Sequence, residues 1–409
     1  MSLKHPICFD DIVAARERIS KAVFKTQLEL SESASKWIGK KIFFKYENQQ
    51  RTGSFKIRGA YNRISQLSAD QLKAGISACS AGNHAQGVAL CAKLLGSQSY
   101  IVMPEVAPLA KVVATQGYGA NVILKGSMFD EAYDHCMQIS KENSYTLVHP
   151  YEDPEVVAGQ GTIGLELLEQ CAELDTVVVP IGGGGLISGI ALALKTLKPQ
   201  IKIIGAVPER VPAMKMLFDS KGDLPEKAPY KSTIADGIAV KKPSKMIYDT
   251  YISKYVDDIV SVSDDEIARA MVFLLERAKA VVEGSGAASL AAAKKASHEL
   301  GDNVGIVISG GNVDLNLLAS VIEKGLEHEG RLCRISVVVD DVPGMLNSLT
   351  QTIASHGANI LEVTHRRLAQ GIDIRQTEIE ILLSTRNQEH VEKIKNALLA
   401  GGIFIKDIL

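Results

Sequence analysis

One lysine stands out because of its neighbours. Lys56 follows a flexible Gly-Ser pair and the aromatic Phe55, and it opens a segment with helical spacing of apolar residues. An ammonium at a helix N-terminus faces the positive end of the helix dipole, so the neutral amine is favoured. A nucleophilic or Schiff-base lysine requires a neutral amine. The alternative is a solvated surface lysine, and this stretch alone leaves both interpretations open.

Four consecutive glycines form a second candidate element. They separate an apolar strand predicted over Thr176–Ile181 from a helix predicted to run to Leu197, and they are Gly182, Gly183, Gly184 and Gly185. Amides converge at such a turn, and the missing Cβ atoms let an anion approach. Neither G-x-G-x-x-G nor GxxxxGK[ST] fits residues 182–189, which argues against a dinucleotide or nucleoside triphosphate. A phosphate site is favoured over a purely structural turn.

Two more predicted strands end in polar turns. The first turn comprises Ser80, Ala81, Gly82, Asn83 and His84, and the second runs from Ser309 to Asn312. Exposed amides at the first turn suit a substrate carboxylate, and the Asn83 side chain can reach a cofactor hydroxyl. His84 alone is more typical of a structural histidine. Ligand sites in α/β proteins lie where parallel strands end, so these turns and Lys56 are expected to meet.

The elements that position these residues alternate between strand and helix, which predicts βαβ units and parallel sheets. Predicted strands are Lys41–Tyr46, Ile76–Ser80, Ser99–Met103, Asn121–Leu124, Tyr145–Val148, Thr176–Ile181, Lys202–Val207 and Val304–Ile308. Predicted helices include Asp10–Val23, Phe129–Asn143, a helix opened by Gly159-Gln160-Gly161-Thr162 and running to Glu169, Asp264–Val282 and Ser285–Leu300. Residues 208–245 are expected to be mainly loop.

The chain changes character near residues 326–331. Beyond them the predicted order is strand Arg334–Val339, helix Gly344–His356, strands Asn359–Arg367 and Arg375–Ser384, helix Gln388–Ala400 and strand Gly402–Leu409. This βαββαβ order is that of a ferredoxin-like domain.

Composition excludes several classes of protein. The 409 residues are long enough for two or three units, and the formal charge of −2 provides no basic field for nucleic acid or an anionic membrane. No apolar run reaches the roughly 18 residues of a membrane span. Six scattered cysteines without CxxC spacing indicate reduced thiols in a cytoplasmic protein and no zinc site.

Together the motifs resemble the threonine dehydratase family of fold-type-II pyridoxal-phosphate enzymes. In order over about residues 5–325 they are TGSFKIRGA, SAGNHAQG, HPYEDPEVVAGQGTIGLE, VPIGGGGLISG, IADG, EGSGAA and SGGN. The tail resembles an ACT domain, with DVPGML at its first strand-to-helix turn. The resemblance implies a catalytic domain over 1–325, with a small lobe at about 50–150 inserted in a large lobe, and an ACT domain over 330–409.

The resemblance also implies roles. Lys56 would form the Schiff base with pyridoxal 5'-phosphate, Phe55 would pack beside its ring, and Asn83 would bond its O3'. The four glycines and the Leu186 amide would hold the phosphate. Ser309 would face the pyridine nitrogen, and a neutral hydroxyl there makes a weaker electron sink, which suits prompt β-elimination. The turn from Ser80 to His84 would bind the substrate.

At two places the sequence differs from related families, and the differences bear on the predicted reaction and on metal binding. Serine racemases of the superfamily carry a second serine where this chain has Ala81, so Lys56 is left as the base at Cα. Relatives that bind a divalent cation use acidic residues where this chain has Val207, Val211 and Ala213, so no metal is expected.

The predicted reaction is dehydration and deamination of threonine to 2-oxobutanoate and ammonia, with serine giving pyruvate. The ACT domain would respond to isoleucine, with valine as a possible counter-effector, or serve only as a dimerisation module. A homo-oligomer, dimer or tetramer, is expected. The alternatives are a serine/threonine racemase, a serine-preferring dehydratase, and an amino-acid sensor on an inactive core.

Overall fold

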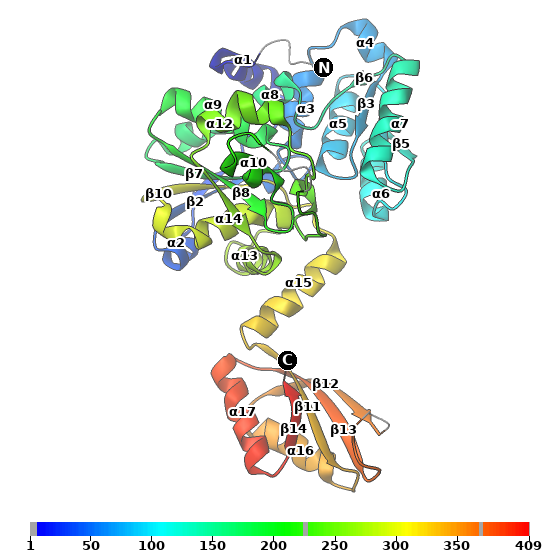
Figure 1. Cartoon of the computed structure of the whole chain (residues 1–409), viewed down its shortest axis with the longest axis vertical. Coiled ribbons are helices and arrows are strands. Elements are labelled where there is room, and N and C mark those ends of the chain that lie inside the picture. The colour runs from blue at the N-terminus through cyan, green and yellow to red at the C-terminus, as the bar shows by residue number, and fades with distance from the viewer. Residues whose placement is uncertain (1–5, 224–227, 368–370, 409) are drawn as a thin grey trace. The chain divides into compact units, whose positions relative to one another are not determined.

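The computed structural model describes residues 6–223, 228–367 and 371–408. The chain divides into two compact units, with the division after Asp314 (Figure 1). Helix α15 (Leu315–His328) is grouped with the C-terminal unit. The two units are therefore taken in turn.

The larger sheet of the first unit has the order β1-β2-β10-β7-β8-β9. Its strands are β1 (Leu28–Leu30), β2 (Lys41–Tyr46), β7 (Thr176–Pro180), β8 (Lys202–Pro208), β9 (Asp258–Val262) and β10 (Asn303–Ile308). Within this sheet the edge pair β1–β2 is antiparallel and the other pairs are parallel. A second sheet, all parallel, has the order β5-β4-β3-β6. It contains β3 (Ile76–Cys79), β4 (Ser99–Met103), β5 (Asn121–Leu124) and β6 (Thr146–Leu147). The predicted parallel-rich α/β architecture is confirmed.

Helices cover these sheets (Figure 1). The longer ones are α1 (Phe9–Ile19), α3 (Lys56–Ile64), α5 (Asn83–Leu94), α6 (Leu109–Gly117), α7 (Phe129–Glu142), α8 (Pro154–Gln170), α9 (Gly185–Leu197), α13 (Asp264–Arg277) and α14 (Gly284–Lys295). The shorter ones are α2 (Glu32–Ile38), α4 (Ala69–Ala74), α10 (Ala213–Asp219), α11 (Lys245–Ile247), α12 (Ser253–Tyr255), η1 (Glu47–Gln49), η2 (Asp236–Ile238), η3 (Tyr248–Ile252) and η4 (Ser297–Glu299).

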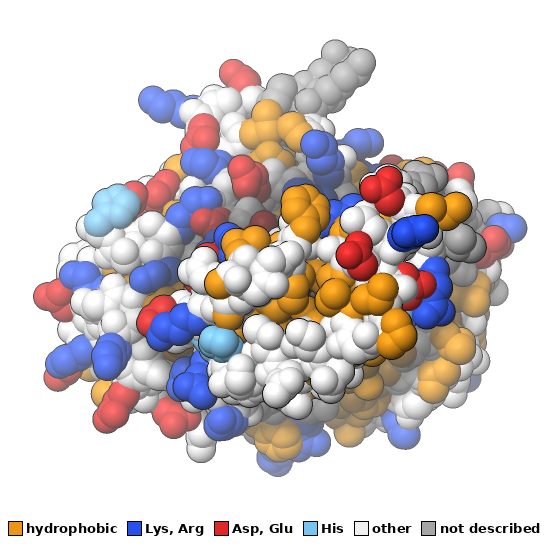
Figure 2. Space-filling view, turned by 90° about the horizontal axis from the view of Figure 1, so that it is seen from below, with side chains coloured by type: hydrophobic (Ala, Val, Ile, Leu, Met, Phe, Trp, Pro, Cys, Tyr) orange, Lys and Arg blue, Asp and Glu red, His pale blue; other side chains and the backbone are white. Residues whose placement is uncertain are grey.

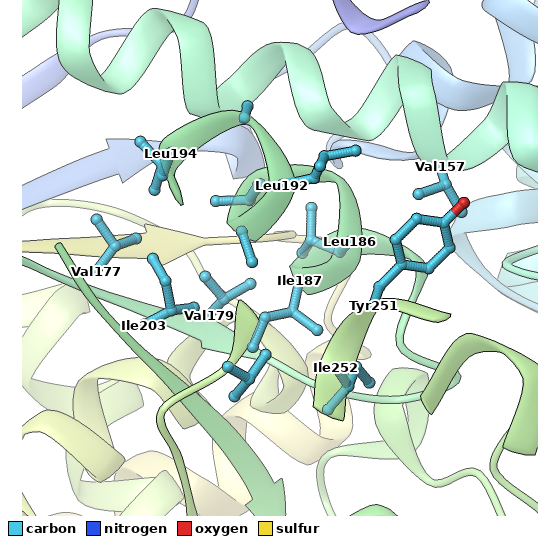
Figure 3. Close-up of a cluster of buried hydrophobic side chains, with 14 of the residues drawn as sticks. Val157, Val177, Val179, Leu186, Ile187, Leu192, Leu194, Ile203, Tyr251 and Ile252 are labelled. Carbon is cyan, nitrogen blue, oxygen red and sulfur yellow. The ribbon is translucent and has the colours of Figure 1, made fainter. Parts of the chain in front are cut away.

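The main core lies between β7, β8 and helix α9. Figure 3 shows Val177 and Val179 of β7 and Ile203 of β8 beside Ile187 and Leu194 of α9. Every residue of β7 is buried, which explains its unbroken apolar run, since a central strand covered on both faces has no side for polar residues. This packing fixes where β7 ends, and therefore where the four glycines begin.

The predicted start of the helix at Gly159 is wrong. Helix α8 begins at Pro154, and the Asp153 side chain accepts from the amides of Glu155 and Val156. The glycines serve a close helix crossing instead: a Cβ at Gly159 would lie 2.5 Å from the Arg58 carbonyl oxygen of α3. Gly159 therefore does not mark the start of α8; it lies inside the helix, where α8 packs closely against α3.

Two other helices end earlier than predicted. Helix α1 ends at Ile19 rather than Val23, and α13 ends at Arg277 rather than Val282. Strands β1 and β9 and helix α15 were not predicted, because short edge strands and an exposed amphipathic helix leave weak patterns.

The C-terminal unit is a four-stranded antiparallel sheet of order β12-β13-β11-β14 with helices α16 and α17. Its elements are β11 (Leu332–Asp340), α16 (Met345–Ser355), β12 (Asn359–Arg366), β13 (Gln376–Ser384), α17 (Gln388–Ala400) and β14 (Phe404–Ile408). The predicted βαββαβ unit is confirmed, although Leu409, the last residue of the predicted strand, lies outside the described residues. The face opposite the helices carries hydrogen-bonded polar groups: Glu378 accepts from Ser336 at 2.6 Å and from Lys406 at 2.9 Å.

Charges of both signs are interspersed with apolar side chains on the face shown in Figure 2, in keeping with a formal charge of −2. Within the described ranges, no helix combines the length and apolar character that crossing a bilayer needs. The six cysteines are all unbonded.

Candidate active site

Every site residue predicted from the sequence lines one cavity of about 730 Å³. They are Phe55, Lys56, Ser80, Ala81, Gly82, Asn83, His84, Gly182, Gly183, Gly184, Gly185, Leu186 and Ser309. They come from the N-terminus of α3 and from the turns after β3, β7 and β10. The carboxyl ends of strands in both sheets thus supply one site, as parallel topology predicts.

Lys56 is the first residue of α3, and its Nζ donates to the Pro150 carbonyl oxygen at 3.2 Å. Burial lowers the pKa of Lys56 to about 8, and the nearby Glu283 carboxylate opposes the shift. The sequence predicted a readily neutralised amine from the helix dipole, but burial is the largest cause. The amine is therefore accessible in its nucleophilic form near neutral pH.

The loop before α3 is held against the turn after β10. Phe55 N–H donates to Ser309 O at 3.2 Å, and Gly311 N–H donates to Gly53 O at 2.9 Å. Gly53 has φ +70°, and a Cβ there would lie 2.4 Å from Asn312 Oδ1. The TGS and SGGN motifs therefore form one structure that places Lys56 beside Ser309.

Behind Lys56, the same helix carries a fully buried guanidinium. Arg58 bonds Glu47 through Nη2 at 2.8 Å and Glu166 through Nη1 at 2.6 Å. Lys45, also fully buried, donates to Glu166 at 2.6 Å. We refer to Lys45, Glu47, Arg58 and Glu166 as the buried charge cluster. It joins β2, η1, α3 and α8 and balances two positive charges with two negative ones.

The four-glycine turn opens helix α9. Gly184 has φ +94°, and a Cβ at Gly183 would lie 2.2 Å from the ring of Tyr151, so neither position accommodates a larger residue. The first amides of a helix have no intrahelical acceptor and attract anions. An anion cradle, a buried amine and the Ser309 hydroxyl, 2% exposed at the end of β10, thus face one cavity. This set of groups fits pyridoxal phosphate, which carries a phosphate, an aldehyde and a ring nitrogen.

His84 is a buried structural histidine. Its Nε2 donates to the Val148 carbonyl oxygen at 2.8 Å, because a carbonyl can only accept. Burial, then the charge of Lys56, lowers the pKa of His84 to about 3, so the imidazole stays neutral. The His84 ring is therefore unsuited to general acid–base catalysis, and it contributes to the cavity wall by packing alone.

Sequence reasoning assigned no role to the other charged residues on the cavity wall, which are Lys111, Asp130, Asp236, Lys241, Lys242 and Glu283. Lys111 Nζ lies 2.6 Å from Asp236 Oδ2 and joins α6 to η2. Glu283 accepts a hydrogen bond from Asn83 Nδ2 at 2.7 Å. A lone carboxylate at the head of the glycine-rich EGSGAA motif was the available signal for Glu283. The buried charge cluster was missed too, although Arg58 stands in the apolar half of the Lys56 helix.

In the part of the chain that the structure describes, no three or more His, Cys, Asp or Glu side chains are grouped so that they could hold a metal ion. Val207, Val211 and Ala213, where cation-binding relatives were expected to carry acids, are buried apolar residues.

Comparisons with known proteins agree with this geometry. Residues 19–310 match the family described as pyridoxal-phosphate dependent enzyme, and residues 328–400 match the ACT domain family. The L-threonine ammonia-lyase of Thermotoga maritima is 46% identical over 400 residues, covering 98% of this chain and 99% of the relative.

Two solved structures are also similar. Maize serine racemase has a TM-score of 0.73 at 38% identity, covering 79% of this chain and 99% of that one. The processed form of threonine deaminase isoform 2 from Solanum lycopersicum has a TM-score of 0.73 at 33% identity, covering 78% and 90%. The chain belongs to the family of pyridoxal-phosphate dependent enzymes, in its threonine ammonia-lyase branch, and carries a C-terminal ACT domain.

Proposed function

We propose that this chain is an L-threonine ammonia-lyase that removes water and ammonia from threonine to give 2-oxobutanoate, and that it also converts serine to pyruvate. One observation carries the proposal: a lysine amine with a pKa of about 8 shares a cavity with an anion-binding glycine turn and a strand-end hydroxyl. The near full-length similarity to the Thermotoga maritima L-threonine ammonia-lyase supports threonine as the substrate.

Each wall of the cavity has a task in this proposal. Gly182 to Gly185 and the Leu186 amide would hold the cofactor phosphate, Ser309 would interact with its ring nitrogen, and Phe55 would pack beside its ring. The cofactor supplies an electron sink for the electron pair left when Cα loses its proton. The turn from Ser80 to His84 holds the substrate carboxylate through its amides at the start of α5.

Lys56 moves the proton. Its neutral amine accepts the Cα proton of threonine, and burial keeps that amine from being fully protonated near neutral pH. The proton taken from Cα is passed on to the β-hydroxyl, which leaves as water, and the enamine released is hydrolysed to 2-oxobutanoate and ammonia. Because Lys56 both anchors the cofactor and acts as base, the two roles are lost together in any variant without the amine.

A racemase is the second candidate, since a maize serine racemase is among the similar structures. Ala81 argues against it. This residue lines the cavity where racemases of the superfamily carry a serine, and a methyl group cannot accept or return a proton. Racemisation needs a base on each face of Cα, and Lys56 provides only one.

Control by an amino acid at the C-terminal unit is part of the proposal, with isoleucine as the effector and valine as its antagonist. Exposed apolar residues on both edge strands, Leu361 and Val363 on β12 and Phe404 on β14, support pairing of these units in a homo-oligomer.

The decisive assay measures 2-oxobutanoate from L-threonine, pyruvate from L-serine, and the chirality of recovered substrate, with and without isoleucine. Keto acid without D-enantiomer supports the lyase, and D-enantiomer with little keto acid would favour the racemase. Neither product, together with no visible absorbance of a bound cofactor, would indicate an amino-acid sensor. Truncation after Asp314 should abolish any isoleucine response while turnover remains.

A further inference from the structure

Asn83 is held at both ends by polar groups that leave it only one orientation. Its Oδ1 accepts from Asn312 Nδ2 at 2.8 Å, and its Nδ2 donates to Glu283 Oε1 at 2.7 Å. Asn312 Nδ2 also donates to the Thr52 carbonyl oxygen at 2.8 Å. These four residues come from the loop before α3, the start of α5, the start of α14 and the turn after β10.

The direction of this hydrogen-bond chain follows from its ends. A backbone carbonyl can only accept, so Asn312 must turn its NH2 group toward Thr52, and the second hydrogen of that group points to Asn83. Asn83 must therefore present its oxygen to Asn312, which leaves its own NH2 group toward Glu283 Oε1, an atom that accepts whether the side chain is ionised or protonated on Oε2. The Thr52 carbonyl thus sets the orientation of the Asn83 amide, and Glu283 supplies the matching acceptor.

Burial and close contacts hold the Glu283 side chain next to Asn83. Its side chain is buried, its backbone N–H donates to Gly310 O at 3.1 Å, and a Cβ at Gly310 would lie 2.4 Å from Oε1. The charged groups around it are Asp236, Lys111 and Lys56. Burial and the Asp236 charge raise the pKa of Glu283 to about 7, so its ionised and protonated forms coexist near neutral pH. A buried carboxylate is costly unless it has a defined partner.

We propose that Glu283 and Asn312 are positioning residues that fix the Asn83 amide as a hydrogen-bond donor toward the cavity. With Oδ1 engaged by Asn312 and one N–H engaged by Glu283, the remaining N–H of Asn83 is the group available to a ligand. It suits an anionic or neutral oxygen acceptor and excludes a ligand that offers a donor there. The proposal rests on the proposed function, in which that acceptor is the ring oxygen of pyridoxal phosphate.

The test is a double-mutant cycle read out as the dissociation constant of pyridoxal phosphate, from absorbance titration of the full-length cofactor-free chain. Glu283→Leu removes the acceptor, and we expect about 10-fold weaker binding, the scale of a hydrogen bond to a charged group. In an Asn83→Ala background the same change should weaken binding less than about 2-fold, because Glu283 then has no amide to orient. Equal factors in both backgrounds would overturn the proposal.

Two further variants separate orientation from charge and from folding. Glu283→Gln removes the charge but keeps an oxygen acceptor, so binding should stay within about 3-fold of the parent. Asn312→Asp, which turns a donor into an acceptor facing Asn83 Oδ1, should weaken binding about 10-fold, again only when Asn83 is present.

Asn121→Asp, at the exposed first residue of β5, is the matched control and should leave the dissociation constant of pyridoxal phosphate unchanged. A Gln variant as impaired as the Leu variant would show that charge alone matters and would overturn the proposal. A parent chain that binds no pyridoxal phosphate would overturn the proposed function and this inference together. A parent that binds while Glu283→Leu and Asn312→Asp bind equally well would overturn the inference alone.

Discussion

Two cations on helix α3 are two residues apart and are treated in opposite ways. Residues i and i+2 of a helix point to different sides, so Lys56 lines the cavity while Arg58 enters the buried charge cluster. Burial favours the neutral form of both. Among the described residues no carboxylate forms an ion pair with Lys56, and its pKa falls to about 8. At Arg58 burial is outweighed by Glu47 and Glu166, which raise the pKa above its usual value.

The two sides of α3 therefore have different roles. The side that faces the cavity, here called the front, carries the Lys56 amine, and the side that enters the buried charge cluster, here called the rear, anchors the helix through Arg58. The front side leaves an amine without a paired anion, which keeps it reactive. On the rear side, two carboxylates bind a guanidinium that stays charged, and these bonds connect α3 to η1 and α8. Mutations on the two sides should therefore have different signatures: loss of turnover at the front and loss of stability at the rear.

The largest expected effect is at the front. Lys56→Ala should lower threonine turnover by about 10²–10⁴-fold or more, because the base at Cα is removed. The free energy of unfolding at pH 7 should be unchanged or higher, since an amine that resists protonation when buried is gone. Steady-state assays and urea unfolding measure the two quantities. A variant that lost stability as well as turnover would break the proposed separation.

At the rear, Arg58→Met should lower the free energy of unfolding by about 3–5 kcal/mol, because Glu47 loses its buried ion-pair partner and Glu166 keeps only Lys45. Adding Glu47→Gln should restore about 1–3 kcal/mol by removing one unpaired carboxylate. Arg16→Met, at an exposed ion pair with Glu169, is the control and should cost less than about 1 kcal/mol. Equal losses at Arg58 and Arg16 would contradict the importance of burial.

A smaller effect is expected where α3 crosses α8. Gly159→Ala places a methyl group against the Arg58 carbonyl and should cost about 1–3 kcal/mol through overpacking. Gly117→Ala in α6, where a Cβ meets no atom within 4 Å, should be neutral or stabilising. Thermal unfolding of the pair measures the difference, and similar behaviour of both variants would argue against a close crossing.

The sequence predicted that Lys56 would meet the glycine turn and Ser309, which line one cavity, but it did not predict the burial of Arg58 at the rear of α3, and the reason is physical. Lys56, the glycine turn and Ser309 act through local features, a strand end followed by a helix start, and such features leave motifs. The buried charge cluster joins residues 45, 47, 58 and 166, whose meeting depends on tertiary packing. Gly159 was misread for the same reason, since its constraint comes from another helix. Glu283 stands in a recognisable motif, but its role could be inferred only once the structure placed its carboxyl group against the Asn83 amide.

The most direct test of the account is the pKa of Lys56 itself. Reductive methylation with ¹³C-labelled formaldehyde, followed by an NMR pH titration of the cofactor-free chain, would follow its amine, with Lys56→Ala identifying the signal. We predict a midpoint near 8 for Lys56, while exposed lysines titrate at about 10.4. A Lys56 midpoint above 10 would contradict the claim that the front of α3 holds a desolvated, readily neutralised amine.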